Sequence, residues 1–168
     1  KAFVAWSYPP DSFGLAEQAI IEDLDVALYY SAVATSFPAF KGAYENKINN
    51  VLGAGGTNVD DPKVAEYRKA HLEITGKTAD YWASANTYAA LQILEQSIEG
   101  AGSIDRGVVT QYIKDNSFDT VMGTLSFENN ISNTFWSVGQ WQDGVFRGVK
   151  GSDVDGAVSV RVKSGWSE

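Results

Sequence analysis

The chain has 168 residues, no cysteine and one histidine, and its 13 basic and 21 acidic side chains give a formal net charge of −8. The lack of cysteine excludes disulfide scaffolds, zinc fingers, iron–sulfur sites and thiol nucleophiles, and a single histidine excludes a histidine-based metal cluster. The acidic balance and the scattered basic residues argue against nucleic acid as a partner, because a phosphate backbone needs a clustered basic face.

The first third of the sequence alternates apolar runs with amphipathic stretches. In chain order we expect a buried strand over 1–6, a helix from Asp11 or Ser12 to Asp23, a buried strand over 26–30, a short helix ending near Tyr44 and a strand over 50–53. This alternation is typical of an α/β protein, with a parallel sheet covered by helices. The abrupt start of the chain on an apolar run also suggests the middle of a domain.

A glycine-rich segment over 53–58 interrupts the alternation and predicts a linker or a crossing between lobes. It does not fit a nucleotide-binding loop, because Asn58 stands where a third glycine would be required. Beyond it we expect helices from Pro62 to Gly76, from Ala83 to Glu99 and from Ser103 or Asp105 onward. Their expected inward residues are Val64, Tyr67, His71 and Ile74, then Tyr88, Leu91, Leu94 and Ile98, then Val108, Val109, Tyr112 and Ile113.

From Thr120 the sequence changes to short segments with strand character. We expect strands over 121–123 and 125–127, and then strands over 135–141 and 145–149 joined by a tight hairpin at Asp143-Gly144. Apolar residues at alternate positions over 158–162 indicate an edge strand in the tail.

Neither of the usual polar candidates for chemistry is convincing. His71 lies on the apolar stripe of an expected helix, which favours packing or a satisfied hydrogen bond over proton transfer. Asp60 and Asp61 precede Pro62, where helix capping explains an acidic pair. We expect no catalytic residue, no metal ligand and no cofactor.

Aromatic and hydroxyl side chains at the ends of expected elements are more informative. Tyr8 follows the first strand, Ser31 follows the second, and Trp82 comes just before the long helix. Ligands of parallel α/β sheets bind at the carboxyl ends of the strands, so a pocket is expected there. The alternative is that some of these side chains only pack between strands and helices.

The order of segments resembles the C-terminal half of type I periplasmic solute-binding proteins, the branched-chain amino acid and amide binders of ABC importers. The segments that carry the resemblance are Tyr8-Pro9-Pro10-Asp11, Asp25-Val26-Ala27-Leu28-Tyr29-Tyr30-Ser31, Pro62-Lys63-Val64-Ala65-Glu66-Tyr67, Thr75-Gly76-Lys77-Thr78-Ala79-Asp80, Thr87-Tyr88-Ala89-Ala90-Leu91-Gln92, Phe118-Asp119-Thr120-Val121-Met122-Gly123-Thr124-Leu125-Ser126-Phe127 and Gly139-Gln140-Trp141-Gln142-Asp143-Gly144. Each is loose alone, but their order covers almost the whole chain.

The resemblance implies two lobes, each a parallel sheet flanked by helices, to which this chain supplies C-terminal portions. Residues 1–56 and 135–168 would belong to the C-terminal lobe and residues 57–134 to the N-terminal lobe. The chain would cross between the lobes near 55–58 and 135–138. The N-terminal half would be missing from this sequence.

The resemblance also places ligand contacts. Tyr8 falls where amino-acid binders of the family often touch the ligand, and Ala32 falls where some of them have a glutamate that pairs with the ligand's ammonium group. Because a buried cation without a partner is costly, alanine there argues against a standard α-amino acid. An aromatic, amide-like or carboxylate solute stacked on Trp82 or Tyr8 is the open alternative.

The implied function is that of a secreted, soluble, periplasmic binding protein without enzymatic activity, which captures a small polar solute and presents it to an ABC permease in the membrane. Two alternatives stay open. One is a ligand-sensing domain of a receptor or regulator with the same fold. The other is an α/β enzyme, which would need a base and a nucleophile that these residues do not assemble.

Overall fold

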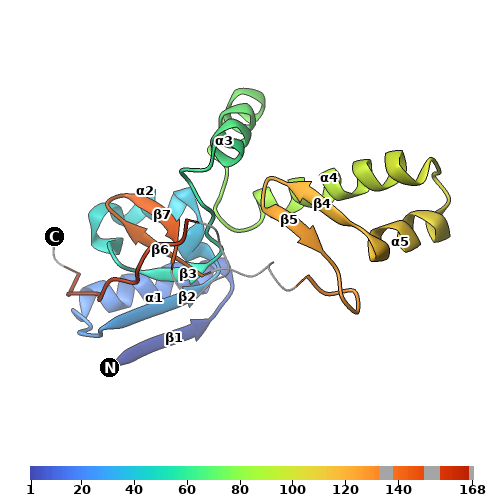
Figure 1. The fold of residues 1–168 in the computed structure, drawn as a ribbon. Coiled ribbons are helices and arrows are strands. Elements are labelled where there is room, and N and C mark those ends of the chain that lie inside the picture. Colours follow the sequence, from blue (N-terminus) through green and yellow to red (C-terminus); the bar gives the residue numbers. More distant parts are fainter. Residues whose placement is uncertain (133–137, 150–155, 167–168) are drawn as a thin grey trace.

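The computed structural model describes residues 1–132, 138–149 and 156–166 (Figure 1). The helices are α1 (Pro9–Ile21), α2 (Pro38–Tyr44), α3 (Pro62–Thr75), α4 (Ser84–Ala101) and α5 (Arg106–Asp115), with short 3-10 turns η1 (Ala34–Ser36) and η2 (Glu45–Ile48). The strands are β1 (Ala2–Trp6), β2 (Leu28–Ala32), β3 (Leu52–Ala54), β4 (Ser117–Thr120), β5 (Gly123–Ser126), β6 (Val138–Gln142) and β7 (Val145–Gly148).

A mixed sheet in the order β1-β2-β3-β6-β7 organises what we call the sheet unit, which also contains α1 and α2. The strands β1, β2 and β3 run parallel, as expected, and β6 pairs antiparallel with both β3 and β7. The hairpin between β6 and β7 turns at Asp143 and Gly144, whose φ values of 54° and 79° are typical of the tight turn that Asp-Gly predicts.

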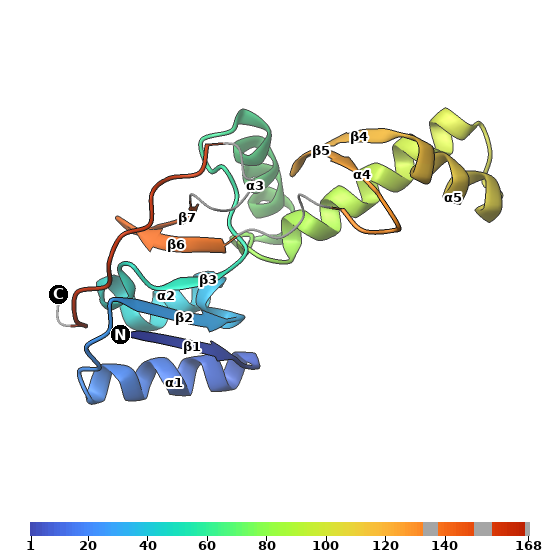
Figure 2. The same ribbon diagram turned by 60° about the horizontal axis from the view of Figure 1, so that its bottom comes forward.

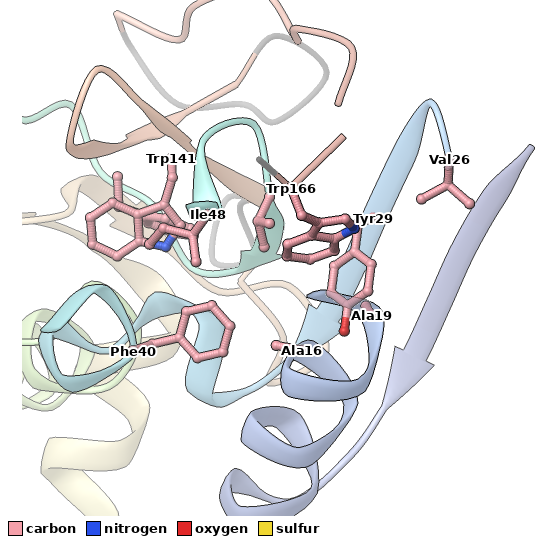
Figure 3. Packing of buried hydrophobic residues seen from close by; sticks show 10 residues of the cluster. Ala16, Ala19, Val26, Tyr29, Phe40, Ile48, Trp141 and Trp166 are labelled. Carbon is pink, nitrogen blue, oxygen red and sulfur yellow. The ribbon is translucent and has the colours of Figure 1, made fainter. Parts of the chain in front are cut away.

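The core of the sheet unit is aromatic (Figure 3). Buried Tyr29 of β2 stacks on Phe3 with 4.8 Å between ring centroids and meets the edge of Trp166 at 4.9 Å. The other buried members are Ala16, Ala19, Val26, Phe40, Ile48, Val51, Trp141 and Phe146. This core therefore joins the first third of the chain to its last residues.

The expected burial of the first strand is wrong. Only one face of β1 packs into this core, and Val4 and Trp6 on the other face are 59% and 78% exposed. These two side chains are exposed because β1 is the edge strand of the sheet and no element among the described residues covers its second face.

A second group of elements, the α4 unit, comprises α3, α4, α5 and the antiparallel pair β4–β5 (Figure 2). Its separate apolar core consists of Val64, Ala85, Ala89, Ile93, Phe118, Val121 and Leu125. The expected strand over 121–123 is wrong, because Val121 and Met122 form the turn between β4 and β5. Thr120 holds that turn, since its Oγ1 donates to the carbonyl of Gly123 at 2.7 Å and accepts from the amide of Met122 at 3.1 Å.

The expected inward face of α4 is also wrong. The helix buries Ala85, Ala89, Ile93 and Ser97, whereas Tyr88, Leu91 and Leu94 are 45%, 59% and 45% exposed. Both stripes have helical periodicity, but α4 meets β4 and α5 through the stripe of smaller side chains. Ile74 of α3 and Val108 of α5, which were expected inside, are exposed as well.

The tail over 156–166 replaces the expected edge strand with a strap held largely by side chains. Val158 forms an isolated bridge with Val149, and beyond it the buried amides of Gln140 and Gln142 donate to tail carbonyls at 2.7 and 2.9 Å. Trp166 ends the strap in the core, where its indole donates to the carbonyl of Leu24 at 3.1 Å.

Candidate functional site

The residues predicted to line a ligand site lie at the carboxyl ends of β1 and β2 and at the start of α4. Because β1 and β2 are parallel, with Trp6 opposite Ala32, these two strand ends share one edge of the sheet. Tyr8 leaves that edge at the residue before α1 and is 81% exposed, whereas Ser31 and Ala32 are buried. Of Tyr8, Ser31 and Ala32, Tyr8 alone has an exposed side chain.

A cluster of serine hydroxyls holds this edge together. The Oγ of Ser7 lies 2.9 Å from that of Ser12 and 3.2 Å from that of Ser31, and it donates to the carbonyl of Ala32 at 2.6 Å. Ser12 also donates to that carbonyl, at 3.0 Å. Ser31 stays a predicted ligand contact; in the structure its side chain is fully buried and its hydroxyl lies against that of Ser7, the residue before Tyr8.

Two aromatic side chains lie next in the strands to the serine cluster, Trp6 before Ser7 and Tyr30 before Ser31. Trp6 lies edge-on to Tyr30, with 5.2 Å between ring centroids, and Trp6 is mostly exposed. Burial raises the pKa of Tyr30 above its ordinary value, so its phenol is neutral at physiological pH. This edge offers ring faces and phenol hydroxyls to a ligand.

Trp82 lies in the turn that precedes α4. One carboxylate oxygen of Asp80 accepts hydrogen bonds from the amides of Trp82 and Ala83 at 2.8 and 2.6 Å, so this acidic group is engaged by the backbone of the turn. The indole N–H of Trp82 is buried and has no hydrogen-bond partner.

Two backbone hydrogen bonds bring the start of α4 to the sheet. The amide of Gly56 donates to the carbonyl of Tyr81 at 2.9 Å, and the amide of Tyr81 donates to the carbonyl of Ser36 at 3.2 Å. Ser36 closes the turn η1 that follows Ala32. Trp82 is therefore anchored beside the loop that follows β2, although 50 positions separate it from Ala32.

The other polar candidates have local structural partners. His71 has its Nδ1 3.0 Å from the carbonyl of Lys77, the satisfied hydrogen bond that was expected, and its ring meets Tyr67. Asp61 caps α3 by accepting from the amide of Lys63 at 2.7 Å, as expected, and Asp60 pairs with Arg147 of β7 at 2.8 Å.

A hollow of about 540 Å³ lies away from the strand ends, among α3, α4 and the end of β4. Tyr67, His71, Tyr88 and Gln92 line it, and none of the predicted ligand residues does. Its wall includes part of the open apolar stripe of α4.

Within the described ranges, no three histidine or acidic side chains are grouped so that they could hold a metal ion. The helices of those ranges are also too short or too polar for any of them to cross a membrane.

Comparison with known proteins identifies the fold. A leucine-binding protein from Thermotoga maritima superposes with a TM-score of 0.68 at 18% identity over 89% of this chain. A leucine-, isoleucine-, valine-, threonine- and alanine-binding protein from Brucella ovis, in its closed conformation, gives 0.74 at 15% identity over 89%. An ABC transporter substrate-binding protein from Desulfitobacterium hafniense in complex with leucine gives 0.61 at 16% identity over 88%.

The matches cover only 43%, 42% and 43% of those three chains, so this chain spans less than half the length of the proteins it resembles. No family model matches the sequence. No curated protein matches it either. At these identities the likeness shows the fold, which is that of type I periplasmic binding proteins.

Proposed function

We propose that this chain is part of an extracytoplasmic, non-enzymatic solute-binding protein that serves an ABC importer and captures a small polar solute between two lobes. The observation that carries the proposal is the edge formed by parallel β1 and β2, where Tyr8 is exposed on a serine-bonded loop in a fold shared with amino-acid-binding proteins. Parallel α/β sheets bind ligands at such an edge.

The proposed lobes follow the two apolar cores. Residues 1–56 and 135–168 would form most of one lobe, and residues 57–134 would contribute to the other. The core of the sheet unit draws on the first and last parts of the chain, and the second core draws on residues between Val64 and Leu125. A solute held between the lobes would be enclosed when they approach each other.

The ligand class follows from what the edge offers. Tyr8 and Trp82 would supply aromatic contacts, and alanine at position 32 leaves that place without a carboxylate for an ammonium group. Ser31 would set the shape of the site through Ser7. We therefore consider amides and small aromatic acids, as well as amino acids, as candidate solutes.

The proposal also includes protein partners. The open face of β1 and the exposed stripe of α4 formed by Tyr88, Leu91 and Leu94 are apolar surfaces that the remainder of a two-lobe protein would cover. In the periplasm, the protein with its bound solute would then dock on an ABC permease in the membrane.

Calorimetric titration with L-leucine, benzamide and benzoate tests the binding function. We expect at least one of these probes to bind, and Tyr8→Ala to weaken its binding by about 1 kcal/mol, roughly fivefold, if the ring packs on the ligand. Tyr8→Phe keeps the ring and should retain most of the affinity. Val162→Ala alters an exposed residue of the tail and serves as the matched control. Absence of binding by all three probes, or unchanged affinity in Tyr8→Ala, would contradict the proposed site.

A further inference from the structure

Tyr81 belongs to the core of the sheet unit although it is close to the start of α4. Its ring lies 5.6 Å from that of Trp141 and 5.5 Å from that of Phe146, measured between ring centroids. Its backbone is bonded on both sides, to Gly56 through the carbonyl and to Ser36 through the amide. Ring and backbone together attach this residue to the sheet.

The next helix belongs to the other core. Ala85, at the second position of α4, is buried with Val64, Ala89 and Phe118 in the α4 unit. The boundary between the two cores therefore falls within the few residues that separate Tyr81 from Ala85. Asp80, the residue before Tyr81, accepts hydrogen bonds from the amides of Trp82 and Ala83 in that interval, so the link between the units is short.

Glycine is required at position 55, because the backbone of Tyr81 packs directly against it. Gly55 has a φ of 102°, and a Cβ built on it would collide with the carbonyl oxygen of Tyr81 and approach the Cα of Trp82. A side chain at Gly55 would therefore displace Tyr81 from its packed position near Trp141 and Phe146.

Arg68 of α3 contacts the same ring. Its guanidinium carbon lies 4.1 Å from the ring centroid of Tyr81, a cation–π distance. Val64 and Tyr67 of α3 pack in the core of the α4 unit. Arg68, on the same helix, therefore links the α4 unit to Tyr81, whose ring packs in the sheet unit. Tyr81 is thus contacted by residues of both units.

We propose that Tyr81 is the pivot between the two units: its ring stays seated in the sheet unit while α3, α4 and the elements packed on them turn about Trp82 and Ala83. This inference rests on the proposed function, because turning of the units would open and close the ligand site. Tyr81 acts as a positioning residue and sets how far Trp82 can move relative to Tyr8.

Unpaired polar atoms beside the pivot support a second arrangement of the units. Within the described ranges, buried side-chain atoms without a hydrogen-bond partner include Thr57 Oγ1, Trp82 Nε1 and Asn86 Oδ1. Thr57 follows Gly56, which bonds to Tyr81, and Asn86 is tied to Trp82 by a bond of 2.6 Å from its amide to the Trp82 carbonyl. Such atoms are costly when unpaired, and a turn at Trp82 and Ala83 would change the surroundings of Trp82 and move Asn86 relative to Thr57.

The lack of cysteine makes the test direct, because spin labels can be attached at introduced cysteines alone. One label pair, Gln18→Cys on α1 and Gln111→Cys on α5, spans the units in the full chain. A second pair, Gln18→Cys and Ala43→Cys on α2, lies within the sheet unit. All three positions are exposed. Pulsed dipolar spectroscopy without ligand then reports the distribution of each label distance.

We expect Tyr81→Ala to shift the distribution between the units or broaden it about twofold or more, because the second arrangement becomes populated, and to leave the pair within the sheet unit unchanged. Tyr81→Phe keeps the ring and should match the wild type. Arg68→Leu alters only the contact from α3 and should change the same distribution, so it decides the matter if Tyr81→Ala fails to fold.

Two results would overturn the pivot. One is an unchanged distribution between the units in both Tyr81→Ala and Arg68→Leu. The other is equal broadening of both label pairs, which would show that Tyr81 holds the sheet unit itself together. Neither result depends on a ligand, so the pivot can fail while solute binding stands, and binding can fail while the pivot stands.

Discussion

Tyr29→Phe should stabilise the protein, although it removes a polar group from the centre of the core. The Tyr29 side chain is fully buried between Phe3 and Trp166, and its hydroxyl has no hydrogen-bond partner. An unpaired buried hydroxyl is destabilising by about 1–3 kcal/mol. Removal of the oxygen alone should therefore raise the free energy of unfolding by about 1 kcal/mol, with the ring contacts kept.

Tyr44→Phe is the matched control of opposite sign. The Tyr44 hydroxyl donates to the carbonyl of Phe13 at 2.8 Å, so its removal breaks a hydrogen bond and should lower the free energy of unfolding by about 1 kcal/mol. Urea unfolding followed by circular dichroism measures both variants. A lower stability for Tyr29→Phe, or the same sign of change in the two variants, would refute the reasoning.

The pH dependence gives a second readout of Tyr29. Burial, with a smaller contribution from Tyr44, raises the pKa of Tyr29 above its ordinary value of 10.0. The unfolded chain therefore loses this proton before the folded chain does. Ionisation of Tyr29 therefore leaves the free energy of unfolding unchanged below about pH 10 and lowers it as the pH rises further. The stability advantage of Tyr29→Phe over the wild type should widen above pH 10 and stay constant between pH 6 and 9.

Three further substitutions test how other parts are held, each by urea unfolding. Trp166→Ala should destabilise by about 3–5 kcal/mol, because its buried indole anchors the tail strap in the core; a change below 1 kcal/mol would contradict that role. Asp105→Ala should lower the free energy of unfolding by about 0.5–2 kcal/mol, since Asp105 caps α5 by accepting hydrogen bonds from two amides. An unchanged stability would contradict this capping role. Gly139→Ala should cost about 1–3 kcal/mol, because the new methyl group would strike the ring of Phe146. Its control, Gly42→Ala, meets open space within α2 and should stabilise slightly.

Local signals in the sequence predicted some element boundaries correctly. Asp61 and Pro62 predict the start of α3, and the structure begins the helix there with the expected cap. The Asp143-Gly144 turn predicts the β6–β7 hairpin, which is present. Such signals succeed because capping and turn geometry depend on a few adjacent residues.

The candidate site was only partly predictable. The positions of Tyr8 and Trp82 at element ends follow from the sequence, and their contact with a ligand stays a prediction. The bonding of Ser7 to Ser12 and Ser31 was not foreseen, because it joins a strand end, a helix start and a second strand end. The seating of Tyr81 beside Gly56 was also missed, since the two lie 25 positions apart.

By itself, the sequence determined the order and kind of most elements, the cysteine-free acidic composition and the resemblance to a two-lobe binding fold. Tertiary structure decided which apolar faces are buried. Helical periodicity marks Tyr88 and Leu91 as clearly as Ala89 and Ile93, yet α4 buries the second pair and exposes the first. Periodicity is a property of one helix, whereas burial depends on which surface packs against it, and β4 and α5 reach that surface through contacts distant in the chain.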